Sequence, residues 1–187
     1  MKLLFWQWHS FMGKGVERAL KKLKIEYDTF FYQMKDWEND KEFVQQLEKR
    51  LISGLYNVVF SINFNPIISD VCEKYRVAYR AWVYDSPIHI RNLAPLKNAY
   101  TKVYFFDRGQ ADEYRKNGIG AEYLPLASDV EIFYPIAVSE QVLTTSAVPQ
   151  TAAHPVFPIL MLLCMMLLVF REEQKLQRSP CRKKNAA

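Results

Sequence analysis

Asp85, Ser86, His89 and Arg91 bring a carboxylate, a hydroxyl, an imidazole and a guanidinium close together in the sequence, with Pro87 forcing a turn between them. A carboxylate in such a loop can bind a sugar hydroxyl or accept a proton. It can equally form an Asx-type turn or cap the segment that starts at Ser86. The sequence leaves both interpretations of Asp85 open.

The segment from His9 to Gly15 is a second candidate for chemistry. It holds His9 and Ser10, then Gly13-Lys14-Gly15 directly before a predicted helix, where free backbone N–H groups and the helix dipole favour an anion. No Ser or Thr follows the lysine as in a Walker motif, and the third glycine of a dinucleotide-binding motif is missing. The segment is therefore predicted to be either a plain tight turn or a loop that contacts substrate.

Other polar and aromatic signals favour structural roles. Asp107 follows a predicted strand and precedes a predicted helix, which favours a helix cap. The early aromatic residues lie mostly in predicted strands and on core-facing helix sides, where packing explains them better than base stacking. His9, His89 and His154 lack the spacing of a metal site, so we predict no metal.

Charge and cysteine usage narrow the function classes. The chain of 187 residues has 25 Lys and Arg against 20 Asp and Glu, and residues 1–135 hold 19 basic against 17 acidic side chains. Such a small excess is weak support for nucleic-acid binding, so we predict no nucleic-acid partner. Three distant cysteines cannot form a disulfide framework, which favours a reducing, cytoplasmic setting.

Alternating strand-like and helix-like segments must position the two candidate loops. Six apolar and aromatic runs predict strands at residues 2–8, 27–33, 56–62, 77–84, 102–106 and 121–126. Helical spacing begins at Val16, recurs from Phe43, begins again at Pro66, and covers residues 110–117. Gly54 and Gly118 are predicted to end the second and the last of these helices. The N-terminal run is too short for a signal peptide and is predicted as a strand.

This order predicts an α/β fold, a three-layer Rossmann-like domain with a mainly parallel six-stranded sheet, because the connections are too long for hairpins. The side chains expected in its core are Leu3, Phe5, Val58, Phe60, Val83 and Phe105, and Cys72 is expected to face the core. Ligands of such sheets bind outside the carboxyl ends of the strands. Both candidate loops are predicted to leave that edge.

Several segments together resemble a known family. They are Trp82–Pro87 (WVYDSP), Phe105–Asp107 (FFD), Gly118–Gly120 (GIG) and Tyr123–Pro135 (YLPLASDVEIFYP). The chain resembles the N-terminal half of CgeB-like (spore maturation protein-like) glycosyltransferases, in which such an LPLA segment leads from the first Rossmann-like domain of a GT-B fold into the second. The resemblance covers about residues 1–135.

The resemblance implies the acceptor-side domain of a glycosyltransferase that uses a nucleotide-sugar donor. Asp85 or His9 would position or deprotonate an acceptor hydroxyl, and a second set of residues would bind substrate: Ser10, Gly13, Lys14, Gly15, Ser86, His89 and Arg91. The chain would hold no cofactor itself, because the nucleotide-sugar donor belongs to a second domain. We therefore expect a chain truncated before that domain and inactive alone; the alternative is a non-catalytic α/β binding module with a marginal C-terminal membrane anchor.

Composition changes near Pro135. Residues 136–187 contain no glycine and include the uncharged run Val156–Phe170, which as a helix would span roughly 22 Å against a hydrocarbon core of about 30 Å. This tail is either a short membrane anchor or a non-native segment that is disordered or collapses onto the domain. The second interpretation includes departure from the native reading frame just after Pro135.

Overall fold

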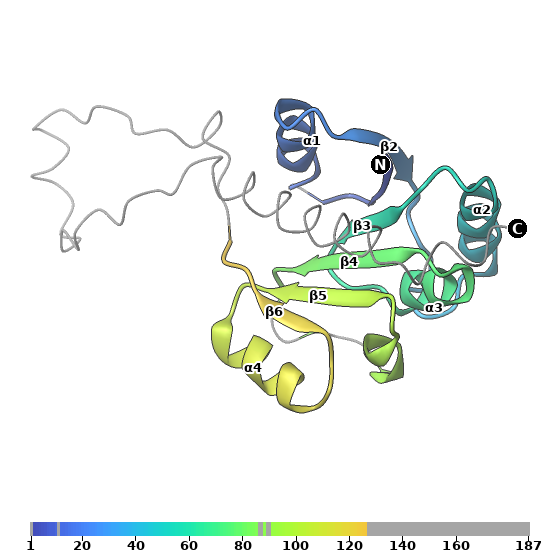
Figure 1. Cartoon of the computed structure of the whole chain (residues 1–187). Helices are drawn as coiled ribbons and strands as arrows, with labels where there is room; N and C mark the ends of the chain where they lie inside the picture. The colour runs from blue at the N-terminus through green and yellow to red at the C-terminus, as the bar shows by residue number, and fades with distance from the viewer. Residues whose placement is uncertain (1, 11, 86–87, 89–90, 127–187) are drawn as a thin grey trace, which may run out of the picture.

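The computed structural model describes residues 2–10, 12–85, 88 and 91–126 (Figure 1). Six strands form one sheet in the order β2-β1-β3-β4-β5-β6, and every neighbouring pair is parallel. The strands are β1 (Lys2–Gln7), β2 (Glu26–Phe31), β3 (Val58–Ile62), β4 (Ala78–Val83), β5 (Thr101–Phe105) and β6 (Ala121–Tyr123). The predicted α/β fold with a six-stranded parallel sheet is confirmed.

The described helices connect successive strands. They are α1 (Gly13–Lys22), α2 (Lys41–Ile52), α3 (Pro66–Tyr75), the short 3₁₀ helix η1 (Ala94–Lys97) and α4 (Arg108–Lys116). None of these helices combines the length and apolarity that a membrane crossing requires. The predicted boundary near Pro135 and residues 136–187 lie outside the described residues.

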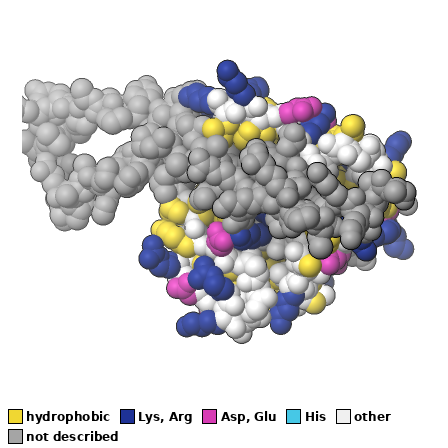
Figure 2. Space-filling model, in the orientation of Figure 1, with side chains coloured by type: hydrophobic (Ala, Val, Ile, Leu, Met, Phe, Trp, Pro, Cys, Tyr) yellow, Lys and Arg dark blue, Asp and Glu magenta, His cyan; other side chains and the backbone are white. Residues whose placement is uncertain are grey.

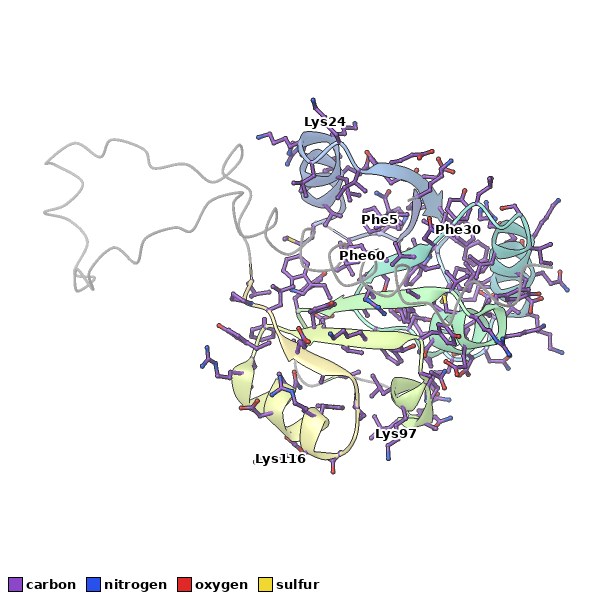
Figure 3. The ribbon with its side chains drawn as sticks, in the orientation of Figure 1. Phe5, Lys24, Phe30, Phe60, Lys97 and Lys116 are labelled. Carbon is purple, nitrogen blue, oxygen red and sulfur yellow. The ribbon has the colours of Figure 1, made fainter. Side chains whose placement is uncertain are left out.

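Alternate residues of each strand enter two separate cores, one on each face of the sheet. Leu3, Phe5, Val58 and Phe60 pack on the face that carries α1, which we call the α1 face. Residues of α2, α3, η1 and α4 pack on the opposite face, together with Val83 and Phe105. All six predicted core residues are at most 1% exposed. In Figure 3, Phe5 and Phe60 lie together within the sheet, and their ring centroids are 5.5 Å apart.

Helix boundaries follow from local chemistry. The Asp107 carboxylate accepts a hydrogen bond from the Gln110 amide at 2.6 Å, so its predicted role as the cap of α4 is confirmed. Gly54 and Gly118, predicted to end α2 and α4, have φ of 68° and 76°, in the left-handed region that glycine adopts readily. The predicted buried position of Cys72 in α3 is confirmed as well.

The predicted start of α1 at Val16 was wrong, because the helix begins at Gly13. The two glycines have low helix propensity, which hid the first turn in the sequence. Gly13-Lys14-Gly15 is therefore the first turn of α1 instead of a tight turn before it.

The order of the strands reverses between β1 and β3. The chain moves from β1 to β2 on one side and then crosses back to β3 on the other side of β1. The helices that follow β1 and β3 pack on opposite faces of the sheet. In doubly wound sheets, ligands bind at the carboxyl edge beside such a reversal.

Candidate functional site

A pocket of about 200 Å³ lies at the carboxyl edge of the sheet, beside this reversal. Its lining comes from the ends of β1, β3 and β4 and from the loop between β2 and α2: Trp8, Trp37, Asn63, Phe64, Val83, Asp85 and Ile88. Three aromatic side chains thus surround one carboxylate and one amide. A mainly apolar cavity with a few placed polar groups is typical of a small-molecule site.

Asn63 connects the loop after β3 with the loop after β4. Its φ is 62°, in the left-handed region, which asparagine tolerates better than most residues. Its side-chain carbonyl accepts a hydrogen bond from the Tyr84 amide at 3.1 Å, and its amide nitrogen donates to Asp85 Oδ2 at 2.5 Å. The Asn63 backbone N–H donates to the Trp82 carbonyl at 2.8 Å. One residue therefore fixes both the backbone and the carboxylate at the end of β4.

Asp85 is the exposed carboxylate of the pocket. Oδ2 is held by Asn63, whereas Oδ1 makes no hydrogen bond with the described residues. The second oxygen can therefore accept a hydrogen bond from a ligand hydroxyl without breaking an existing contact. The alternative role of Asp85 as a cap involves Ser86, which lies outside the described residues.

Two indole rings build the aromatic wall of the pocket. Trp8 directly follows β1, and its Nε1 donates to the Ile62 carbonyl at the end of β3 at 3.2 Å. The Trp37 ring meets the Trp8 ring edge-on, with centroids 5.0 Å apart and an interplanar angle of 85°. Trp37 also contacts Trp6 edge-on at 5.5 Å. Aromatic pairs prefer such geometry, so the two indoles hold each other in place.

Asn65 attaches the loop that carries Trp37 to the start of α3. Its Oδ1 caps the helix by accepting from the Ile68 amide at 3.1 Å, and its Nδ2 donates to the Trp37 carbonyl at 3.0 Å. The Tyr79 hydroxyl accepts from the Asn65 amide at 2.9 Å. Burial raises the pKa of Tyr79, so this hydroxyl stays protonated and can also donate a hydrogen bond.

Trp8 is the only described residue of the loop between β1 and α1 that lines the pocket. The His9 ring packs edge-on against Phe31 of β2, with centroids 5.2 Å apart, and His9 is not among the pocket residues. Ser10 Oγ accepts from the Met12 amide at 3.3 Å, which shapes the entry to α1. The structure therefore does not bring the two predicted catalytic residues, His9 and Asp85, into one contact group.

The remaining described residues that were predicted to bind substrate lie in two places, the first turn of α1 and the loop after β4. Gly13 and Gly15 are buried in the first turn of α1, while Lys14 is exposed. Arg91 is exposed, and its backbone amide donates to Glu38 Oε1 at 2.5 Å in the loop that carries Trp37. Ser86 and His89 lie outside the described residues.

Trp8, Trp37 and Asn63 were missed by the sequence reasoning. The apolar run at residues 2–8 predicts Trp8 within the first strand, and neither the loop after the second strand nor the loop after the third strand carries a recognisable motif. The expectation that ligands bind after the carboxyl ends of strands also applies to these loops, so it would have marked Trp37 and Asn63. The bonds between the loops join residues 22 and 28 positions apart and leave no periodic pattern.

The described residues contain no group of three or more His, Cys, Asp or Glu side chains that could hold a metal ion.

Cys72 is completely buried, and burial raises the pKa of its thiol, which disfavours the reactive thiolate. Figure 2 shows the described Lys and Arg side chains spread around the rim of the molecule in that view. The chemistry of the pocket therefore depends on aromatic surface, one amide and one carboxylate.

No protein-family model matches this chain, and no curated protein matches it.

Proposed function

We propose that residues 1–135 form the acceptor-binding domain of a glycosyltransferase that uses a nucleotide-sugar donor. The observation that carries the proposal is the pocket at the carboxyl edge, in which the Asn63–Asp85 pair lies among Trp8, Trp37 and Phe64.

The pocket chemistry fits a sugar ring. A pyranose has C–H groups that pack against aromatic faces and hydroxyl groups that bond to carboxylates and amides. A volume of about 200 Å³ is below the roughly 300–1,000 Å³ typical of sites for drug-sized ligands. The pocket therefore suits one sugar ring better than a complete nucleotide-sugar. In this proposal a second domain binds the donor.

Asp85 is the residue that would act on the acceptor. Asn63 holds one carboxylate oxygen, and the other can accept a hydrogen bond from the attacking hydroxyl. During transfer, the hydroxyl oxygen bonds to the anomeric carbon, the nucleoside diphosphate leaves with the electron pair, and the carboxylate accepts the proton. His9 is no longer preferred for this role, because its ring lies against Phe31.

The family resemblance supports the same location. The WVYDSP segment ends β4 and supplies Asp85, and the FFD segment ends β5 and supplies the cap of α4. Both motifs therefore lie at the carboxyl edge of the sheet, which is where ligands bind in this type of fold.

Sugar binding tests the proposal directly. The full chain is titrated with methyl glucoside, methyl galactoside and N-acetylglucosamine, and the change in tryptophan fluorescence is measured. Two of the four tryptophans, Trp8 and Trp37, line the pocket. We expect saturable quenching by at least one sugar and at least tenfold weaker binding by Asp85→Asn. Asp112→Asn, on α4, is the matched control and should bind as the unchanged chain does.

Donor binding separates the two halves of the proposal. Calorimetry with uridine and guanosine diphosphate-sugars should show no micromolar binding to this chain, since the donor site lies in the second domain. Tight donor binding would refute the acceptor-side assignment. If Asp85→Asn and the unchanged chain showed identical quenching by the sugar, Asp85 would not contact the sugar.

A further inference from the structure

The Asp85 carboxylate is the single charged group among the described residues that line the pocket. The other described walls are uncharged, and consist of three aromatic rings, two aliphatic side chains and one amide. A ligand that enters therefore meets negative charge, and no lysine or arginine among these described walls balances it.

The loops around the pocket extend this negative charge. They are residues 8–12, 32–40, 63–65 and 84–93, which follow β1, β2, β3 and β4. Their sequences contain four acidic residues and two basic ones, whereas the whole chain has a formal charge of +5. The pocket thus lies at an acidic edge of a basic protein, and such an edge attracts cations.

Hydrogen bonds connect two of these acidic loops. Asp36 and Glu38 directly flank Trp37 in the sequence, and Asp36 Oδ1 accepts from the Glu38 amide at 2.9 Å. Glu38 Oε1 in turn accepts from the Arg91 amide in the loop that follows β4. The carboxylates beside Trp37 and the carboxylate of Asp85 are therefore held on the same side of the molecule.

The aromatic walls favour the same kind of ligand. The π face of an indole attracts a cation that lies within about 6 Å of the ring centroid, and tryptophan does so more strongly than other aromatic residues. Trp8 and Trp37 both line the pocket, and their rings are nearly perpendicular, at 85°. Aromatic side chains grouped in this way bind organic ammonium groups in other proteins.

Asp85 can bind an ammonium group and a hydroxyl group together. Oδ2 accepts from Asn63, whereas Oδ1 makes no hydrogen bond with the described residues. A carboxylate oxygen has two lone pairs, so Oδ1 can accept one N–H from an ammonium and one O–H from the neighbouring carbon. An amino sugar carries these two groups side by side, and its C–H groups can pack against the indoles.

We propose, on the basis of the acceptor function above, that the acceptor is an amino sugar with a free ammonium group. Asp85 pairs with the ammonium group and accepts from the adjacent hydroxyl. Trp8 and Trp37 contact the ring and the cation. The pocket therefore discriminates by charge, and it binds amino sugars more tightly than neutral sugars and neutral sugars more tightly than acidic ones.

Pairs of sugars that differ in one group test this order. The full chain is titrated at low salt with the methyl glycosides of glucosamine and galactosamine and with the parent methyl glucoside and methyl galactoside, and the change in tryptophan fluorescence is measured. We expect the amino form to bind at least tenfold more tightly than its parent, and methyl glucuronide to bind more weakly than methyl glucoside. High salt should reduce both differences, because it screens charge.

The outcomes separate this proposal from the acceptor function. Equal affinity for the amino and parent forms, or tighter binding of methyl glucuronide, would overturn the amino-sugar assignment and leave the acceptor function intact. Absence of binding by all of these sugars would refute the acceptor function as well.

Asp85→Asn identifies the source of the preference. Asparagine keeps a carbonyl oxygen that can accept from Asn63 but removes the charge, and the side chain at this position is exposed. The affinity for the amino form should fall at least tenfold further than the affinity for the parent, so that the preference disappears. Asp112→Asn, which removes the same charge from α4, is the matched control and should keep the preference. An undiminished preference in Asp85→Asn, or an equal loss in Asp112→Asn, would contradict pairing of the ammonium group with Asp85.

Discussion

The loop after β1 and the loop after β4 leave the same edge of the sheet but are held in different ways. The β4 loop is bonded across the sheet by Asn63, which contacts the Tyr84 amide and the Asp85 carboxylate. The β1 loop is also bonded to other segments, from Trp8 Nε1 to the Ile62 carbonyl and from the His9 amide to Gln33 Oε1, but these bonds position an indole ring and backbone instead of a carboxylate. A carboxylate fixed by a neighbouring strand is organised for binding before any ligand arrives.

The largest expected effect comes from Asn63→Ala. This change removes the side-chain bonds to the β4 loop and places alanine in the left-handed region, where it is strained. We expect a loss of about 2–3 kcal/mol in the free energy of unfolding, measured by urea denaturation.

Asn63→Gly separates the two causes. Glycine adopts the same φ without strain but does not restore the hydrogen bonds. It should recover about 1 kcal/mol of stability while sugar binding stays as weak as with alanine. Full recovery of binding by glycine would show that the bonds to Tyr84 and Asp85 do not organise the pocket.

A smaller, pH-dependent effect is expected at Asp40, which holds the loop that carries Trp37. The Phe43 amide donates to Oδ1 at 3.0 Å, and this bond holds the pKa of Asp40 below its ordinary value. A lowered folded-state pKa gives stability above the unfolded pKa of about 3.9, and that stability is lost as the pH falls through the folded value.

Asp40→Asn keeps a helix cap but removes the charge. The stability difference from the unchanged chain should therefore be present at pH 7 and shrink below about pH 4. Urea denaturation at pH 7 and pH 3 measures it. If the difference in the free energy of unfolding were the same at pH 7 and pH 3, the charge of Asp40 would not contribute to stability.

The smallest effects are expected in the β1 loop. Ser10→Ala and Lys14→Ala should each change the free energy of unfolding by no more than about 0.5 kcal/mol and leave sugar binding unchanged. Lys14 is exposed, and neither residue lines the pocket. A tenfold loss of sugar binding with Lys14→Ala would contradict this expectation and indicate that the sugar binds near the start of α1.

The sequence was informative where structure depends on neighbours along the chain. The buried strands, the cap at Asp107 and the turn at Gly118 follow from local apolar runs and local backbone chemistry, and all three predictions are confirmed. Asp85 was marked as a candidate because it directly follows an apolar strand.

The rest of the pocket depends on contacts between distant segments. Asn63 reaches Asp85 only after β3 and β4 pair, and Asn65 reaches Trp37 only when α3 packs beside the β2–α2 loop. His9 and Asp85 both follow predicted strands, but a side chain at the end of a strand can point toward either neighbouring strand. Its ring leans toward β2 and Phe31.

The position of bound sugar tests the central claim most directly. The indole N–H signals of the four tryptophans can be followed by nitrogen-15 NMR during titration with the methyl glycosides. We predict that the Trp8 and Trp37 signals shift with saturation, while the Trp82 signal, on the opposite face of the sheet, stays in place. Shifts confined to Trp82 or to the amides of residues 9–15, or no shifts at all, would contradict the assignment of the Asn63–Asp85 pocket as an acceptor site.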